Sequence, residues 1–107
     1  MESFEQIDTP KAKELIVSGK VTIVDIRDAD SYAQGHIPNS ILVTDENINR
    51  FLETADKHKT VICYCYHGIS SQMAAQYFKD NGFHKAFSIV GGFEEWRSAY
   101  PDEVVSE

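Results

Sequence analysis

The stretch that decides the fold is "CYCYHGISSQMAAQYF", residues 63–78. Its first three residues end the apolar run "TVICYC" at 60–65. A short loop containing Gly68 and a helical pattern follow. An apolar, β-branched run of this length predicts a strand that is covered on both faces. The segment therefore predicts a buried strand, a tight loop and a helix in succession, with Cys65 at the carboxyl end of the strand.

Similar runs recur along the chain. The runs "VTIVDI" at 21–26 and "KAFSIV" at 85–90 predict two more strands, "FEQI" at 4–7 a short edge strand, and "HIPNSILV" at 36–43 a loop leading into another strand. Strands that alternate with helical patterns predict an α/β fold, with a parallel sheet of about five strands flanked by helices on both faces. Ligands of such sheets bind beyond the carboxyl ends of the strands.

Capping residues predict where the helices begin and end. Thr9 is expected to cap the first helix, with Pro10 at the first helical position and Gly19 just past its end. Thr44 is expected to cap the helix that comes after it, and Gly82 to end the helix after the cysteine loop.

The helix after the cysteine loop carries apolar side chains at helical spacing. Ala74 and Phe78 lie one turn apart, and so do Met73 and Tyr77. This spacing predicts a broad buried face that includes both pairs.

Length and composition limit the classes of protein. The 107 residues predict one domain, 1–107, and no apolar run approaches the roughly 20 residues that span a bilayer. The start of the chain lacks the pattern of a signal peptide, so we expect a cytoplasmic protein. No heptad pattern or long bare strand edge stands out, so we expect a monomer or weak dimer. A net charge of −7 argues against binding nucleic acid, and any anion site must be made locally by N–H groups or an arginine.

The two cysteines, Cys63 and Cys65, do not form a disulfide framework, because two residues apart on one strand they are poorly placed to bridge. They also supply too few ligands for a zinc site, and the histidines are scattered, so we expect no metal and no cofactor. Cys63 lies within the apolar run and is expected to pack in the core.

Cys65 is a candidate nucleophile because of the short loop after it. Only residues 66–70 separate it from a helix that should begin near Ser71, so the loop must curl tightly. The loop N–H groups and the helix N-terminus would then surround the sulfur and lower the pKa of the thiol. The alternative is a small buried side chain with no chemical role. His67 could transfer a proton, although a loop histidine is more often solvated.

Three segments together resemble the rhodanese family of sulfurtransferases, and within it the small single-domain thiosulfate sulfurtransferases. These segments are "DIRDADSYAQGHIPNSI" at 25–41, "CYHGISS" at 65–71 and "GGFEEW" at 91–96. The resemblance implies that Cys65 carries a persulfide between thiosulfate and a thiophilic acceptor such as cyanide, a thiol, or a dithiol such as thioredoxin. It implies that the substrate is bound by Tyr66, His67, Gly68, Ile69, Ser70 and Ser71.

Arg27 is a further candidate for binding the substrate, because it comes directly after a strand at the same edge of the sheet. It could equally pair with Asp25 or Asp28 and fix a loop, and we favour this structural role. Many rhodaneses carry a basic residue at the last loop position, where this chain has Ser70.

Other functions remain open on the same scaffold. A phosphatase of the related Cys-x5-Arg type would need arginine at position 71, which holds Ser71. A non-catalytic binding module, or a sensor of oxidants or persulfides, would need only the fold or a reactive thiol.

Overall fold

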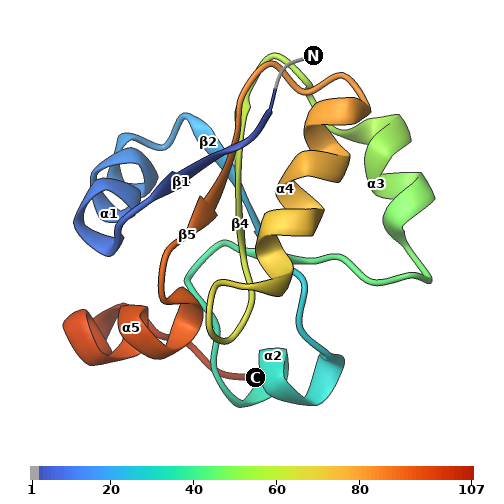
Figure 1. Cartoon of the computed structure of the whole chain (residues 1–107). Coiled ribbons are helices and arrows are strands. Elements are labelled where there is room, and N and C mark those ends of the chain that lie inside the picture. The colour runs from blue at the N-terminus through green and yellow to red at the C-terminus, as the bar shows by residue number, and fades with distance from the viewer. Residues whose placement is uncertain (1–2) are drawn as a thin grey trace.

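The computed structural model describes residues 3–107, so the first two residues of the predicted domain 1–107, Met1 and Glu2, lie outside the described residues. Five strands form one sheet in this range, in the order β1-β5-β4-β2-β3, and every neighbouring pair is parallel (Figure 1). The strands are β1 Glu5–Ile7, β2 Val21–Asp25, β3 Ile41–Leu42, β4 Thr60–Tyr64 and β5 Ala86–Ile89. The predicted α/β fold with a parallel sheet is confirmed.

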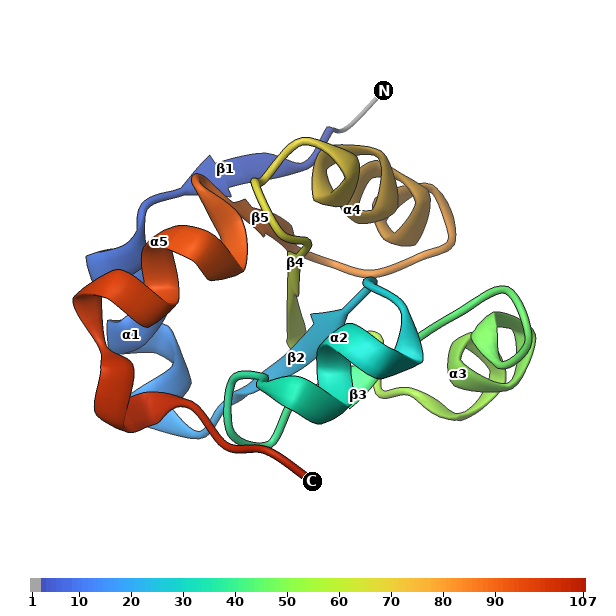
Figure 2. The ribbon, with the colours of Figure 1, turned by 90° about the horizontal axis from the view of Figure 1, so that it is seen from below.

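Helices cover both faces of this sheet. They are α1 Thr9–Ser18, α2 Ala29–Gln34, α3 Ile48–Thr54, α4 Ser70–Asp80 and α5 Gly92–Ala99, followed by the short 3-10 helix Pro101–Glu103. Figure 2 shows α1 and α5 on one face and α3 and α4 on the other, with α2 near the end of the sheet. Across residues 3–107 none of the helices has the length and apolar character needed to cross a bilayer.

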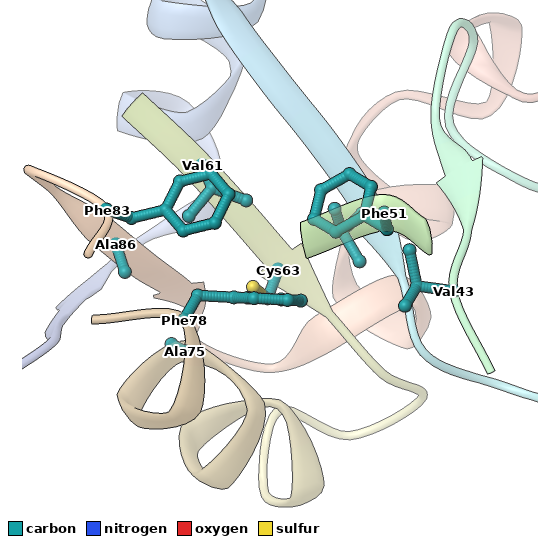
Figure 3. Close-up of a cluster of buried hydrophobic side chains, with 9 residues drawn as sticks. Val43, Phe51, Val61, Cys63, Ala75, Phe78, Phe83 and Ala86 are labelled. Carbon is teal, nitrogen blue, oxygen red and sulfur yellow. The ribbon is translucent and has the colours of Figure 1, made fainter. Parts of the chain in front are cut away.

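The central strand β4 supplies side chains to two separate cores because successive residues of a strand point to opposite faces. Val61 and Cys63 face α3 and α4, while Ile62 and Tyr64 face α1 and α5. Figure 3 shows Cys63 among the aromatic and aliphatic side chains on the first of these faces. Cys63 is fully buried, and this burial raises the pKa of its thiol. The expected packing role of Cys63 is confirmed.

The sheet register brings the ends of two strands to the same level. Asp25 at the end of β2 pairs in register with Tyr64 at the end of β4. The loops after β2 and β4 therefore leave the sheet side by side, and Cys65 begins one of them.

Two predicted N-caps are wrong. Asp8 caps α1 by accepting a hydrogen bond from the Lys11 N–H at 2.9 Å, whereas Thr9 is the first helical residue and is buried. Asp is as good a cap as Thr, and the buried side chain of Thr9 is not available to the helix end. Thr44 precedes a turn, and α3 begins only at Ile48.

Two hydrogen bonds of the Asn47 side chain explain why α3 begins late. Asn47 accepts from the Thr44 N–H at 2.7 Å and donates to the Leu42 carbonyl at 2.9 Å, which fixes a turn before the helix. At the helix C-termini, Gly19 caps α1 in the left-handed conformation as predicted. Helix α4 ends at Asp80, and Asn81 occupies its C-cap position. Gly82, the predicted C-cap, lies one residue after the observed cap.

The predicted buried face of α4 is wrong in part. Phe78 is buried and Ala74 partly so, but the side chain of Met73 is 79% exposed and Tyr77 is also exposed. The row that faces the sheet consists of Ser71, Ala75 and Phe78, spaced by four and three residues. Met73 and Tyr77 lie on the neighbouring outward row, and apolar spacing alone does not distinguish the two rows.

Candidate active site

The loop between β4 and α4 is held in a tight curl by Gly68. This glycine has a φ of 85°, in the left-handed region that other residues rarely adopt. A Cβ atom at this position would lie 2.8 Å from both the Gly91 nitrogen and the Ile89 carbonyl oxygen. The loop therefore packs directly against the backbone after β5, and only glycine permits this approach.

The curl directs two backbone N–H groups at the sulfur of Cys65. The Gly68 N–H donates to Sγ at 3.1 Å, and the Ser71 N–H, in the first turn of α4, donates at 3.3 Å. Burial by itself raises the pKa of Cys65, but hydrogen bonds from Ser71, Gly68 and His67 outweigh it. The pKa of Cys65 therefore lies below its ordinary value, and the site favours a thiolate.

A buried pair of hydroxyls lies behind the sulfur. Ser71 Oγ lies 3.4 Å from Cys65 Sγ and 2.7 Å from the Oγ of Ser88 on β5, and both serines are fully buried. When Cys65 is a thiol it donates to Ser71. When it is a thiolate, Ser71 can donate to the sulfur while Ser88 donates to Ser71. Ser88 was not predicted from the sequence, where its only signal is a hydroxyl inside the apolar run of β5.

Cys65 opens onto a cleft although little of it is exposed. Its exposed fraction is 7%, and it lies at the wall of a cleft of about 700 Å³. The cleft is bordered by the segment after β2, by the cysteine loop and by α5. Its lining includes Arg27, Tyr66, Ser70, Phe93 and Arg97. A small substrate can therefore approach the sulfur from this side.

Helix α5 is fixed to the cysteine loop by backbone hydrogen bonds. The Phe93 N–H donates to the Cys65 carbonyl at 2.9 Å, and the Glu94 N–H donates to the Tyr66 carbonyl at 3.0 Å. Gly92, with a φ of 58°, allows this contact, because a Cβ there would lie 2.5 Å from the Cys65 carbonyl oxygen. The first turn of α5 and the loop therefore hold each other in place.

Arg27 borders the cleft but pairs with Asp25. This pairing is the structural role that we favoured for Arg27 from the sequence. Its guanidinium donates to both carboxylate oxygens of Asp25, with Nη2 at 2.7 Å, and to the Gly35 carbonyl at 2.6 Å. Asp25 is fully buried and the Arg27 side chain is only 8% exposed. Burial lowers the pKa of Arg27, but the hydrogen bonds and charge of Asp25, together with Tyr64, outweigh this effect and raise the pKa above its ordinary value. Arg27 therefore fixes the loop after β2.

The outer side chains of the cysteine loop face solvent. Tyr66, His67, Ile69 and Ser70 are all exposed, and the ring of His67 lies 4.5 Å from that of Tyr66. Among residues 3–107 the structure gives no hydrogen bond from the His67 ring to Cys65, so a Cys–His pair is not formed.

Arg97 of α5 contacts the outer side of the loop at Tyr66. Its Nη2 donates to the Tyr66 hydroxyl at 2.6 Å and to Glu94 at 2.9 Å. A hydrogen bond with Glu94 raises the pKa of Tyr66, and the same bond lowers the pKa of Glu94. Arg97 was not predicted from the sequence, because only the packing of α5 against the loop brings it to the cleft.

Comparison with known proteins shows which family the sequence matches. Residues 8–99 match the family model described as Rhodanese-like domain. The thiosulfate sulfurtransferase GlpE of Coxiella burnetii is 42% identical over 98 residues, which are 92% of this chain and 92% of that protein.

Solved structures share the fold as well. A rhodanese-related protein from Thermoplasma volcanium is 25% identical with a TM-score of 0.81, over 97% of this chain and 100% of that chain. A Rhodopseudomonas palustris protein of unknown function, described as a possible tyrosine phosphatase, is 33% identical with a TM-score of 0.77, over 90% of this chain and 81% of that chain.

Proposed function

Because the chain belongs to the rhodanese-like domain family, we propose that it is a thiosulfate sulfurtransferase that acts through a persulfide on Cys65. The observation that carries this proposal is the pair of N–H groups from Gly68 and Ser71 directed at one sulfur on the wall of an open cleft. Such a site stabilises a thiolate without a dedicated base.

In the first half-reaction the Cys65 thiolate attacks the outer sulfur of thiosulfate. A sulfur–sulfur bond forms to Cys65, the bond to the sulfonate sulfur breaks, and sulfite leaves with the electron pair. The three negative charges of the reactants are carried by the persulfide and sulfite, so no proton transfer is required. This agrees with the absence of a hydrogen bond between the His67 ring and Cys65 in the described residues.

The persulfide is held by the same groups that hold the thiolate. The negative charge moves to the outer sulfur, toward the loop amides and the Ser70 and Ser71 hydroxyls. A thiophilic acceptor then attacks the outer sulfur and releases the Cys65 thiolate. Cyanide serves in an assay, and a thiol or a dithiol such as thioredoxin is the proposed acceptor in the cell. We propose a substrate pocket made of Tyr66, His67, Gly68, Ile69, Ser70 and Ser71, bordered by Arg27.

Intact-mass measurement tests this function directly. The protein is incubated with thiosulfate, freed of excess reagent and weighed. We expect a gain of one sulfur atom that cyanide removes as thiocyanate, and no gain in Cys65→Ser. The matched control is Cys63→Ser, which should still gain the atom if it folds. Wild-type protein that gains no sulfur would contradict the proposal.

The same experiment, together with an assay of aryl phosphate hydrolysis, separates the alternatives. A phosphatase would hydrolyse an aryl phosphate, but a phosphate ester calls for an arginine within the loop, and position 71 holds Ser71. A binding module would neither gain sulfur nor hydrolyse the ester. A sensor of oxidants would gain no sulfur from thiosulfate, and its Cys65 would instead be oxidised by peroxide.

A further inference from the structure

The cleft beside Cys65 needs a cation that the cysteine loop does not supply. Thiosulfate is a dianion, and the net charge of the chain is −7, so the overall field of the protein repels it. The loop N–H groups of Gly68 and Ser71 are directed at the Cys65 sulfur. They can hold the reacting sulfurs, but the three oxygens of the donor need other partners.

Two arginines line this cleft, and only one of them is free to exchange partners. The Arg27 side chain is 8% exposed, and its charge is matched by the buried carboxylate of Asp25 through hydrogen bonds to both carboxylate oxygens. Removing Arg27 from Asp25 would leave a buried charge unpaired, which is strongly unfavourable. Arg27 is therefore a poor receptor for an incoming anion.

Arg97 is placed differently. Its side chain is 48% exposed, and its ion pair with Glu94 is a surface contact three residues away on the same helix. Pairs of this kind contribute little and exchange readily with solvent or ligand. Within residues 3–107 the hydrogen bonds of Arg97 both come from Nη2, which leaves the N–H groups of Nε and Nη1 for a ligand.

Contacts of α5 and of Tyr66 hold Arg97 at the cleft beside the cysteine loop. The first turn of α5 donates backbone hydrogen bonds to the carbonyls of Cys65 and Tyr66. Arg97 lies one helical turn after Phe93 on the same helix. Its guanidinium carbon lies 5.3 Å from the centroid of the Tyr66 ring, within cation–π range, and Nη2 also donates to the hydroxyl of that ring. Tyr66 is itself the residue directly after Cys65. The cation is thus held at the cleft by a side chain of the loop.

We propose that Arg97, supported by Tyr66, is the subsite that binds the sulfonate head of the sulfur donor, in place of the missing loop cation. This assignment rests on the proposed sulfurtransferase activity and names the residue that sets its preference for dianionic donors. Arginine suits this role because its planar N–H groups match the oxygens of sulfonates and related oxyanions. Glu94 competes with the donor for the same guanidinium.

The test is steady-state sulfur transfer to cyanide with two donors of different charge. Arg97→Gln should raise KM for thiosulfate by about tenfold, the loss expected for one charge-assisted hydrogen bond. The increase should be smaller for methanethiosulfonate, which carries a single charge. Arg97→Lys should restore part of the affinity, and Glu94→Gln should lower KM for thiosulfate because it removes the competing carboxylate.

Arg50→Gln is the matched control. It makes the same change of net charge at an exposed position on α3 that does not line the cleft, so it should leave KM unchanged. The subsite is overturned if Arg97→Gln and Arg50→Gln give the same KM for thiosulfate, or if both donors respond equally to Arg97→Gln. Failure of the proposed function is a separate result, because wild-type protein would then gain no sulfur from thiosulfate at all.

Discussion

At the scale of single residues, Cys63 and Cys65 show how two identical side chains acquire opposite properties. Burial raises the pKa of Cys63, whose sulfur lies in an apolar core. Cys65 is also mostly buried, but donors from Gly68 and Ser71 converge on its sulfur and its pKa is lowered. The difference arises from position: one residue faces α4 within the strand, and the other lies just past the strand end.

The hydroxyl of Ser71 is expected to control the charge of Cys65. Ser71→Ala keeps the backbone N–H but removes the hydroxyl, so the pKa of Cys65 should rise. At a pH below that pKa, alkylation of Cys65 by iodoacetamide should slow by about tenfold, because one charge-assisted hydrogen bond to the thiolate is lost. Ser98→Ala, at an exposed position on α5 that does not line the cleft, is the control and should leave the rate unchanged. Equal rates in wild type and Ser71→Ala would contradict this role of the hydroxyl.

At the scale of elements, the cysteine loop is shaped from both sides. Helix α4 supplies the Ser71 N–H and hydroxyl, β5 supplies Ser88, and α5 holds the carbonyls of Cys65 and Tyr66. The glycines at 68 and 92 let these elements approach within backbone contact. We therefore expect a change in the first turn of α5 to alter the surroundings of the Cys65 sulfur without any contact to the substrate.

Substitution of Gly92 tests this coupling. Gly92→Ala should lower the free energy of unfolding by at least about 2 kcal/mol more than Gly19→Ala, since two backbone hydrogen bonds to the loop must stretch. Both glycines have positive φ, but a Cβ at Gly19 meets nothing within 4 Å, so the control isolates the crowding. Gly92→Ala should also slow sulfur loading, whereas Gly19→Ala should not. Chemical denaturation and intact mass measure the two effects, and equal losses of stability would contradict the coupling.

At the scale of the whole molecule, the elements were predictable and several of their contacts were not. The apolar runs of β2 and β4, and the short loop after Cys65, can be read from local sequence. Arg97 meets Tyr66 across 31 positions of sequence, and Ser88 meets Ser71 across 17, so only tertiary packing shows these pairs. No spacing rule in one sequence reveals which residues two separate elements will bring together.

The errors at helix ends and on α4 have the same origin. Asp8 and Thr9 are both good caps, and the choice depends on which side chain the fold buries. Met73 and Phe78 both fit an amphipathic helix, and the choice depends on which row meets the sheet. Local propensity limits these alternatives, and packing decides between them.

The packing of α4 can be tested with two substitutions on the same helix. Phe78→Ala should lower the free energy of unfolding by about 3–5 kcal/mol, because it empties a core site among Phe51, Phe83 and Ala75. Met73→Ala should change it by less than about 0.5 kcal/mol, because its side chain is exposed. Urea denaturation measures both values. A large loss in Met73→Ala would show that the outward row is buried in solution.

The most direct test of the account is the pH dependence of Cys65 alkylation by iodoacetamide, with the modified residue assigned by mass. The thiolate fraction grows as the pH rises through the pKa, so convergent N–H donors predict a midpoint below the ordinary pKa of a free thiol. The same measurement on the urea-unfolded chain should return the ordinary midpoint. A folded-state midpoint equal to or above that of the unfolded chain would mean that the loop does not hold a thiolate.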